Sequence, residues 1–211
     1  MEYSTGVEVS EEHVSPRRTT LAYLFWHWPR DGAVGTETYN RYLVDFHRTL
    51  SRARLEGFRG SATFRIEGAP WIGGAGARGY EDWYLLEGSF ALDPLNEVAV
   101  SGPRREPHDQ AAQAAGGGAG GLYRLRSGEP DTVVWSRSAV WITKPPDTGY
   151  EGFYESLVPW TERPQTSLWR RQMVLGPAPE FCLLATDRLR LPEIFEPVVV
   201  ERSRIWPPTK P

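Results

Sequence analysis

The sequence contains one pattern of elements twice, and this repeat constrains the fold more than any single motif. An apolar run at residues 21–29 precedes a helical pattern that begins at Tyr39. A second apolar run at residues 139–145 precedes a helical pattern that begins at Tyr150. Each pair reads as a strand followed by a helix, so the chain is predicted to contain two copies of a β-α-β-β-α-β unit.

The two copies also align residue by residue. When the prolines that end the two runs are superimposed, Phe25 falls opposite Trp141 and His27 opposite Thr143. The apolar residues of both helical patterns then recur at i, i+3 and i+7, which places them on one helix face. They are Tyr39, Tyr42 and Phe46 in the first copy and Tyr150, Phe153 and Leu157 in the second.

The composition is that of an ordinary globular protein. The 211 residues are 40% apolar and 24% charged, which is enough chain for two units of roughly 100 residues with substantial cores. A net charge of −3 with mixed signs argues against a nucleic-acid partner. Nine Trp, nine Tyr and eight Phe predict either thick cores or an aromatic-lined pocket.

The amino terminus and the single cysteine favour a cytoplasmic protein. Residues 1–18 are polar and contain Pro16, which predicts a loose arm or docking extension. No apolar stretch approaches the ~18 residues that cross a bilayer, so no membrane contact is expected. Cys182 lies in an apolar run, where a buried thiol in a reducing compartment is expected.

The first unit is predicted at residues 19–130. Its first strand is apolar on both alternating sets and should be central in a sheet. Thr36 or Thr38 is predicted to cap the first helix, which runs to about Leu55 and is closed by Gly57. Further strands are predicted at 61–67, 82–87 and 122–126, helical segments at 91–102 and 107–115, and a flexible glycine turn at 116–121.

The second unit is predicted at residues 131–211. The segment between the units, SGEPD, is too short for a linker, so the two units should pack as one body. Strands are predicted at 138–144, 168–175, 181–186 and 197–205, with a helix at 150–158 and a helical turn at 191–195.

This order of elements resembles the dimeric α+β barrel superfamily, in which ferredoxin-like units pair their sheets face to face. Its relatives include antibiotic-biosynthesis-type monooxygenases, EthD-like proteins and chlorite dismutases. The resemblance covers residues 19–206, and its most suggestive piece is EGSFALDPLNEVAVSGPRREPHDQAA, a strand followed by two helical segments. It implies an α+β fold with two tandem units in one barrel. It also implies a pocket either between sheet and helices or inside the barrel.

Two histidines are the predicted catalytic residues. His27 ends an apolar strand, where burial would favour the neutral imidazole of a general base or of a metal or haem ligand. A core histidine bonded to a neighbour is the alternative. His108 follows Pro107 and would act as an acid or base, or as an axial haem ligand, if its segment covers the sheet. A solvated helix start is the alternative reading of His108.

Five residues are the predicted substrate-binding set. His47 borders the buried stripe of the first helix and either faces a pocket or edges the core. Arg65, on the polar face of its strand, would hold an anionic substrate inside the barrel or would be solvated. The whole set is Phe25, Tyr42, His47, Arg65 and Trp83.

Several motifs are set aside. The GxGxxG match at residues 74–79 precedes a strand rather than a helix, so it is not a dinucleotide site. No GxSxG elbow occurs, and no histidine pair has the close spacing of a metal site. No cofactor is therefore predicted, with haem as the alternative that the resemblance keeps open.

The sequence thus predicts a small-molecule-binding protein, monomeric or homodimeric, with any site in the first unit. The resemblance suggests cofactor-independent oxygenation, isomerisation or cyclisation of an aromatic or polyketide-like substrate. His27 or His108 would remove a proton, and Arg65 or a Tyr or Trp donor would stabilise the enolate. A haem protein of the same fold and a non-catalytic ligand-binding or interaction module are the alternatives.

Overall fold

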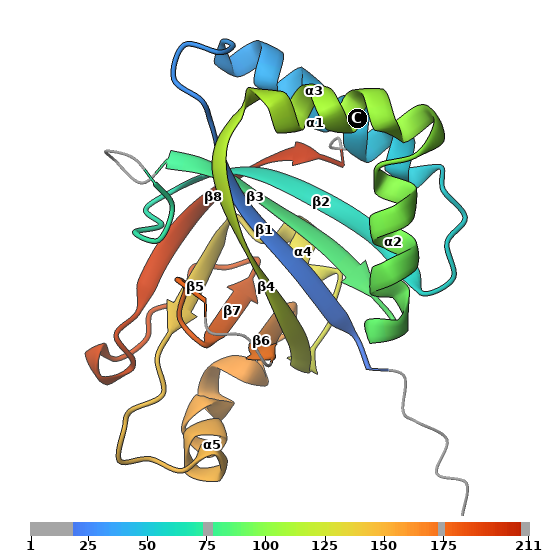
Figure 1. The fold of residues 1–211 in the computed structure, drawn as a ribbon. Helices are drawn as coiled ribbons and strands as arrows, with labels where there is room; N and C mark the ends of the chain where they lie inside the picture. Colours follow the sequence, from blue (N-terminus) through green and yellow to red (C-terminus); the bar gives the residue numbers. More distant parts are fainter. Residues whose placement is uncertain (1–18, 74–77, 173–175, 208–211) are drawn as a thin grey trace, which may run out of the picture.

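Eight antiparallel strands form one closed barrel, with helices packed on its outer surface (Figure 1). The computed structural model describes residues 19–73, 78–172 and 176–207. The predicted arm at residues 1–18 lies outside the described residues. This architecture confirms the predicted α+β class. It also confirms that a strand followed by a helix occurs in both halves of the chain.

The elements follow the predicted order. The strands are β1 (Leu21–Pro29), β2 (Phe58–Glu67), β3 (Arg78–Leu86), β4 (Ala115–Gly128), β5 (Ser138–Ile142), β6 (Thr166–Gln172), β7 (Phe181–Ala185) and β8 (Val198–Trp206). The α-helices are α1 (Thr36–Ser51), α2 (Leu92–Ala99), α3 (Arg105–Ala114), α4 (Thr132–Trp135) and α5 (Tyr150–Thr161). The 3₁₀ turns are η1 (Ser89–Ala91), η2 (Gly102–Arg104) and η3 (Glu193–Phe195). The short α4 was not predicted.

The strand order is that of two ferredoxin-like sheets joined at both edges. The first half of the chain forms β4-β1-β3-β2, and the second half forms β8-β5-β7-β6. Pairing of β2 with β8 and of β4 with β6 closes the barrel. Because both sheet edges are paired within the chain, a second copy is not needed to close it. The predicted boundary near residue 130 follows β4, and the division into two domains stays a prediction.

Side chains from both halves fill the barrel interior. Alternate residues of β1, including Leu24 and Trp26, point inward and are buried. The Trp26 and Trp141 rings meet edge to face with centroids 5.5 Å apart. Six of the nine tryptophans belong to this interior cluster or pack against it, so much of the tryptophan content is barrel core.

The glycine run of residues 116–121 is part of β4 and is not the flexible turn predicted from sequence. It pairs along β1, with Gly118 opposite His27 and Gly120 opposite Phe25. A Cβ on Gly118 would overlap the Phe25 ring, and one on Gly120 would lie 2.9 Å from the Tyr23 hydroxyl oxygen. Glycine is needed at these positions because aromatic rings of β1 occupy the space that a side chain on this strand would take.

Two other sequence-based predictions are wrong in detail. Trp141 points into the barrel, whereas Phe25 lies on the outer face, so the residue alignment of the repeat is out of step by one strand position. Helix α1 begins after Gly35 and ends at Ser51, with Arg52 as its C-cap. Gly57 instead lies in the turn before β2, with a φ of +76° that favours glycine.

The outer faces of the two sheets are covered differently. Helix α5 packs Phe153 and Leu157 against Val140 and Phe181 in a filled cluster. Helices α1, α2 and α3 lie together on the other sheet, at the opposite end of the barrel from α5 (Figure 1). These three helices leave a pocket between themselves and the sheet.

Candidate functional site

A pocket of about 420 Å³ lies between the outer face of the first sheet and helices α1–α3. Strands β1 and β3 supply its floor, which consists of Tyr23, Phe25, His27, Asp82 and Tyr84. The helices supply mostly apolar walls, among them Leu43 and Phe46 from α1, Leu95 and Ala99 from α2, and Ala111 from α3. The combination of an apolar wall with a few polar groups on the floor is typical of a small-molecule site.

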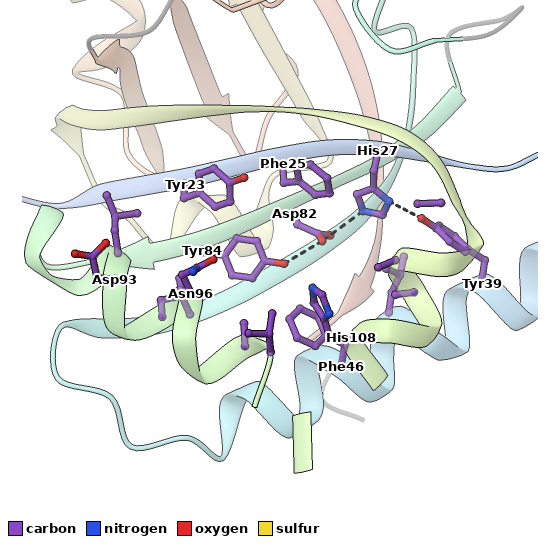
Figure 2. A pocket seen from close by; sticks show the side chains of 18 residues that line it. Tyr23, Phe25, His27, Tyr39, Phe46, Asp82, Tyr84, Asp93, Asn96 and His108 are labelled. Carbon is purple, nitrogen blue, oxygen red and sulfur yellow. Dashed lines mark hydrogen bonds and ion pairs between the residues drawn. The ribbon is translucent and has the colours of Figure 1, made fainter. Parts of the chain in front are cut away.

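His27 is held in the floor by contacts on both ring nitrogens. Its Nδ1 lies 2.8 Å from the Tyr39 hydroxyl oxygen, and its Nε2 lies 3.3 Å from Asp82 Oδ2 (Figure 2). Burial, followed by the Asp82 charge, raises the pKa of Tyr39, so the phenol keeps its proton and donates to Nδ1. The His27 proton is thereby assigned to Nε2, facing Asp82. The ring stacks between Phe25 and Tyr80, with centroids 5.3 and 5.4 Å away.

Asp82 is the hub of the floor, and it is only 3% exposed. Burial alone would raise the pKa of this carboxyl, but His47 and His27 beside it hold the pKa below its usual range. The Tyr84 hydroxyl donates to Asp82 Oδ2 at 3.2 Å. Burial, reinforced by the Asp82 charge, raises the pKa of Tyr84 well above its usual value. The floor therefore carries an ionised carboxylate ringed by protonated phenols.

His47 contacts the same carboxylate from helix α1. Its Nε2 lies 3.4 Å from Asp82 Oδ2, and its Nδ1 shares a hydrogen bond of 2.7 Å with Ser61 Oγ on β2. His47 is fully buried and does not line the pocket. The prediction that it borders the core is matched by its position, but any contact with a ligand would be indirect.

His108 projects from α3 toward the sheet (Figure 2). Its Nδ1 lies 3.0 Å from Asp109 Oδ1, and the ring packs edge to face on Phe46 at 5.7 Å. Within the described residues, Nε2 of His108 has no hydrogen-bond partner. The side chains of His108 and Asp109 are 34% and 50% exposed, so this pair lies at a solvent-accessible part of the pocket wall.

The pocket brings together three of the seven residues predicted from sequence, namely His27, His108 and Phe25. Tyr42 is partly buried against the cluster around Tyr39 and does not line the pocket. Arg65 is exposed on β2. Trp83 points into the barrel, where its Nε1 donates to Glu81 Oε1 at 2.6 Å.

Sequence reasoning missed Asp82, Tyr39 and Tyr84. Asp82 was placed at the start of a strand, where an acidic residue is unremarkable in the sequence. In the structure it lies in the middle of β3, which begins at Arg78. The available signal was the pair of acids Glu81 and Asp82 inside the apolar segment GYEDWYLL. Buried carboxylates need partners, so such a pair predicts two buried polar clusters, one on each face of the strand.

The pocket does not fit a haem. His27 Nδ1 is hydrogen-bonded to Tyr39 and its Nε2 faces the Asp82 carboxylate at 3.3 Å, so His108 is the remaining axial candidate. Among the described residues that line the pocket, none is Arg or Lys, the usual partners of propionates, and Asp82 and Asp93 are present instead. The described residues also contain no group of three or more His, Cys, Asp or Glu side chains placed to hold a metal ion. In that same part of the chain, no helix is long and apolar enough to span a membrane.

No protein-family profile matches the sequence, and no curated protein matches it. Solved structures do match the fold. A proposed monooxygenase of Lactobacillus acidophilus aligns with a TM-score of 0.53 and 10% identity, over 89% of this chain and 94% of its own. A proposed monooxygenase of Fusobacterium nucleatum aligns with a TM-score of 0.54 and 9% identity, over 89% and 93%. At this identity the likeness concerns the fold, and the chain has the fold of the dimeric α+β barrel superfamily, with both ferredoxin-like units in one chain.

Proposed function

We propose that this protein binds an uncharged aromatic, polyketide-like molecule in the pocket and removes a proton from one of its carbon atoms. The observation that carries the proposal is His108, whose Nδ1 pairs with Asp109 and whose Nε2, at an apolar wall, has no partner in the part of the chain that the structure describes. A neutral imidazole in this position is a suitable base for an acidic CH₂ group flanked by aromatic rings.

The charges of the pocket support an uncharged ligand. Ionised Asp82 lies in the floor and Asp93 at the lining, and neither has an Arg or Lys beside it within the described lining. A carboxylate or phosphate ligand would be repelled by this pair of acids. The apolar residues of α1, α2 and α3 favour a flat ring system instead.

Tyrosine hydroxyls are the proposed partners of the enolate that forms. Burial, followed by the Asp82 charge, raises the pKa of Tyr23, so this residue keeps its proton and remains a donor. Tyr23 lines the pocket, and so does Tyr84, whose single hydroxyl proton must turn away from Asp82 before it can reach a ligand. The proposed donors are therefore phenols, and Arg65, which is exposed on β2, takes no part.

Oxygenation without a cofactor is the favoured continuation. The carbanion reacts with O₂, one oxygen atom becomes the new carbonyl oxygen, and the other leaves as water with the two hydrogens of the CH₂ group. Two solved structures of this fold are described as monooxygenases, which agrees with this choice. Isomerisation and cyclisation share the first step and differ only in the fate of the carbanion.

Anthrone, a tricyclic ketone with such a CH₂ group, tests the proposal. We expect the protein to accelerate O₂ consumption and anthraquinone formation above the rate in buffer. His108→Gln should lower kcat by about a hundredfold with little change in KM, because it removes the base and keeps the shape. Gln113→Ala, an exposed change on the same helix, is the matched control. A His108→Gln variant as fast as wild type would contradict the proposal.

A further inference from the structure

Two buried histidines share one carboxylate beneath the pocket. His27 Nε2 and His47 Nε2 lie 3.3 and 3.4 Å from the same atom, Asp82 Oδ2. Beyond them, the chain of contacts continues to the Tyr39 hydroxyl on the pocket side and to Ser61 Oγ on the other. Tyr39 lines the pocket, whereas Ser61 is partly exposed on β2.

Packing alone does not account for this cluster. His27, His47 and Asp82 are at most 3% exposed, and apolar side chains of similar size would fill the same space without desolvating polar groups. Three of its buried atoms, both Nε2 atoms and Asp82 Oδ1, form no well-aligned hydrogen bond with the described residues. Such groups are rare in folded proteins, and each one calls for an explanation.

Among the described residues, the side chains that face Asp82 besides the two histidines are phenols. Tyr84 and Tyr23 approach the carboxylate from the sheet, and Tyr39 approaches from α1 with Tyr80 behind it. The phenols have raised pKa values, because each is buried or lies near the carboxylate. The two imidazoles are thus the groups around Asp82 that carry two ring nitrogens, each able to hold or accept a proton.

We propose that Tyr39, His27, Asp82, His47 and Ser61 form a proton relay that connects the pocket with the β2 surface, and that His47 and Ser61 are positioning residues for reactions in the pocket. The inference rests on the proposed function, because the relay would carry protons to or from the pocket while a bound ligand keeps solvent out.

The transfer conserves protons at every group. Tyr39 passes its hydroxyl proton to His27 Nδ1 and takes one from the ligand or its leaving group. His47 begins with its proton on Nδ1, so its Nε2 is free to accept. His27 Nε2 passes its proton to Asp82 Oδ2, and the same oxygen passes it to His47 Nε2. His47 Nδ1 then donates to Ser61 Oγ, and the serine hydroxyl proton goes to water. One proton crosses the relay, and no group is oxidised or reduced.

Imidazole ¹⁵N NMR of the full chain tests the relay without any activity. The spectra are recorded between about pH 5 and pH 9, where histidine changes charge and tautomer. His47→Gln should change the tautomer or the pH response of the His27 ¹⁵N signals, because both imidazoles contact the same oxygen of Asp82. A His27 titration that is identical in wild type and His47→Gln overturns the relay.

Ser61→Ala provides a second variant that leaves both histidines in place. It should change the His47 tautomer, because the Nδ1 partner is lost. Ser51→Ala, whose hydroxyl bonds only within the last turn of α1, is the control and should change neither histidine. An unchanged His47 signal in Ser61→Ala likewise contradicts the relay.

Kinetics with anthrone separate a relay from a structural role. His47→Gln and Ser61→Ala should lower kcat about tenfold, leave KM near the wild-type value and displace the acid limb of the pH profile. A rise in KM with an unmoved pH profile would show a structural role only and would overturn the proposal. If wild type does not act on anthrone at all, the proposed function fails, and the NMR coupling still decides whether the relay exists.

Discussion

Asp82 is a buried, charged side chain in the pocket floor, and its pKa depends on the histidines beside it. Its pKa is lowered below its usual value of 3.8 in the folded protein, although burial opposes this, because His47 and His27 lie beside it. A lowered folded-state pKa gives stability that is present above pH 3.8 and is lost as the pH falls below it. The contribution of Asp82 to stability should therefore depend on pH in this direction.

Asp82→Asn tests that dependence. The variant should lose about 2 kcal/mol of unfolding free energy at neutral pH, because His27 and Tyr84 lose a charged acceptor. The difference in unfolding free energy between wild type and variant should become smaller as the pH falls below 3.8. Urea denaturation over a pH series measures the loss at neutral pH and its change with pH. Asp93→Asn, at an exposed position, is the control. A gap that stays constant with pH would show that the Asp82 charge contributes nothing.

At the scale of the elements, strand β4 shapes the pocket through the side chains it lacks. Gly118→Ala should lower the unfolding free energy by about 2 kcal/mol, because the new Cβ overlaps the Phe25 ring. Gly152→Ala on α5 is the matched control, since its nearest neighbour is 3.8 Å away, and it should be slightly stabilising. Thermal and chemical denaturation compare them. Equal stability of Gly118→Ala and wild type would mean that β4 does not require this glycine.

The element order was predictable, whereas the role of this strand was not. Alternating and helical apolar patterns are local signals, and they located the strands of the barrel to within a few residues, except that β4 begins at Ala115 and not at Leu122. The glycines of β4 carry no such signal. Glycine is required there because the rings of Tyr23 and Phe25, which are distant in sequence, occupy the space of a side chain. The same holds for the site. His27 and His108 stand out as histidines, but Asp82 becomes informative only once β1, β3 and α1 meet.

At the scale of the whole molecule, a buried ion pair joins the two halves inside the barrel. Arg202 Nε of β8 lies 3.2 Å from Glu81 Oε1 of β3, and both side chains are fully buried. The Arg202 guanidinium also stacks on Phe64 at 3.6 Å and donates to Ser136. Glu81 further accepts from the Trp26 indole at 3.0 Å.

Arg202→Met should be strongly destabilising, by about 3 to 5 kcal/mol, because it leaves the Glu81 carboxylate buried without its cation. The double variant Glu81→Gln with Arg202→Met should lose less than the sum of the two single changes. Denaturation of all four proteins gives this coupling. Additive losses would show that the pair does not hold the halves together.

Proton removal from carbon in the pocket is the central claim, and deuterium exchange of the anthrone CH₂ group under argon tests it most directly. Without O₂, the step common to oxygenation, isomerisation and cyclisation is observed alone by ¹H NMR in D₂O. The wild-type protein should accelerate the loss of the CH₂ signal, and His108→Gln should reduce the acceleration by about a hundredfold. Exchange at the buffer rate with wild type, or an equal acceleration by His108→Gln, would contradict the account.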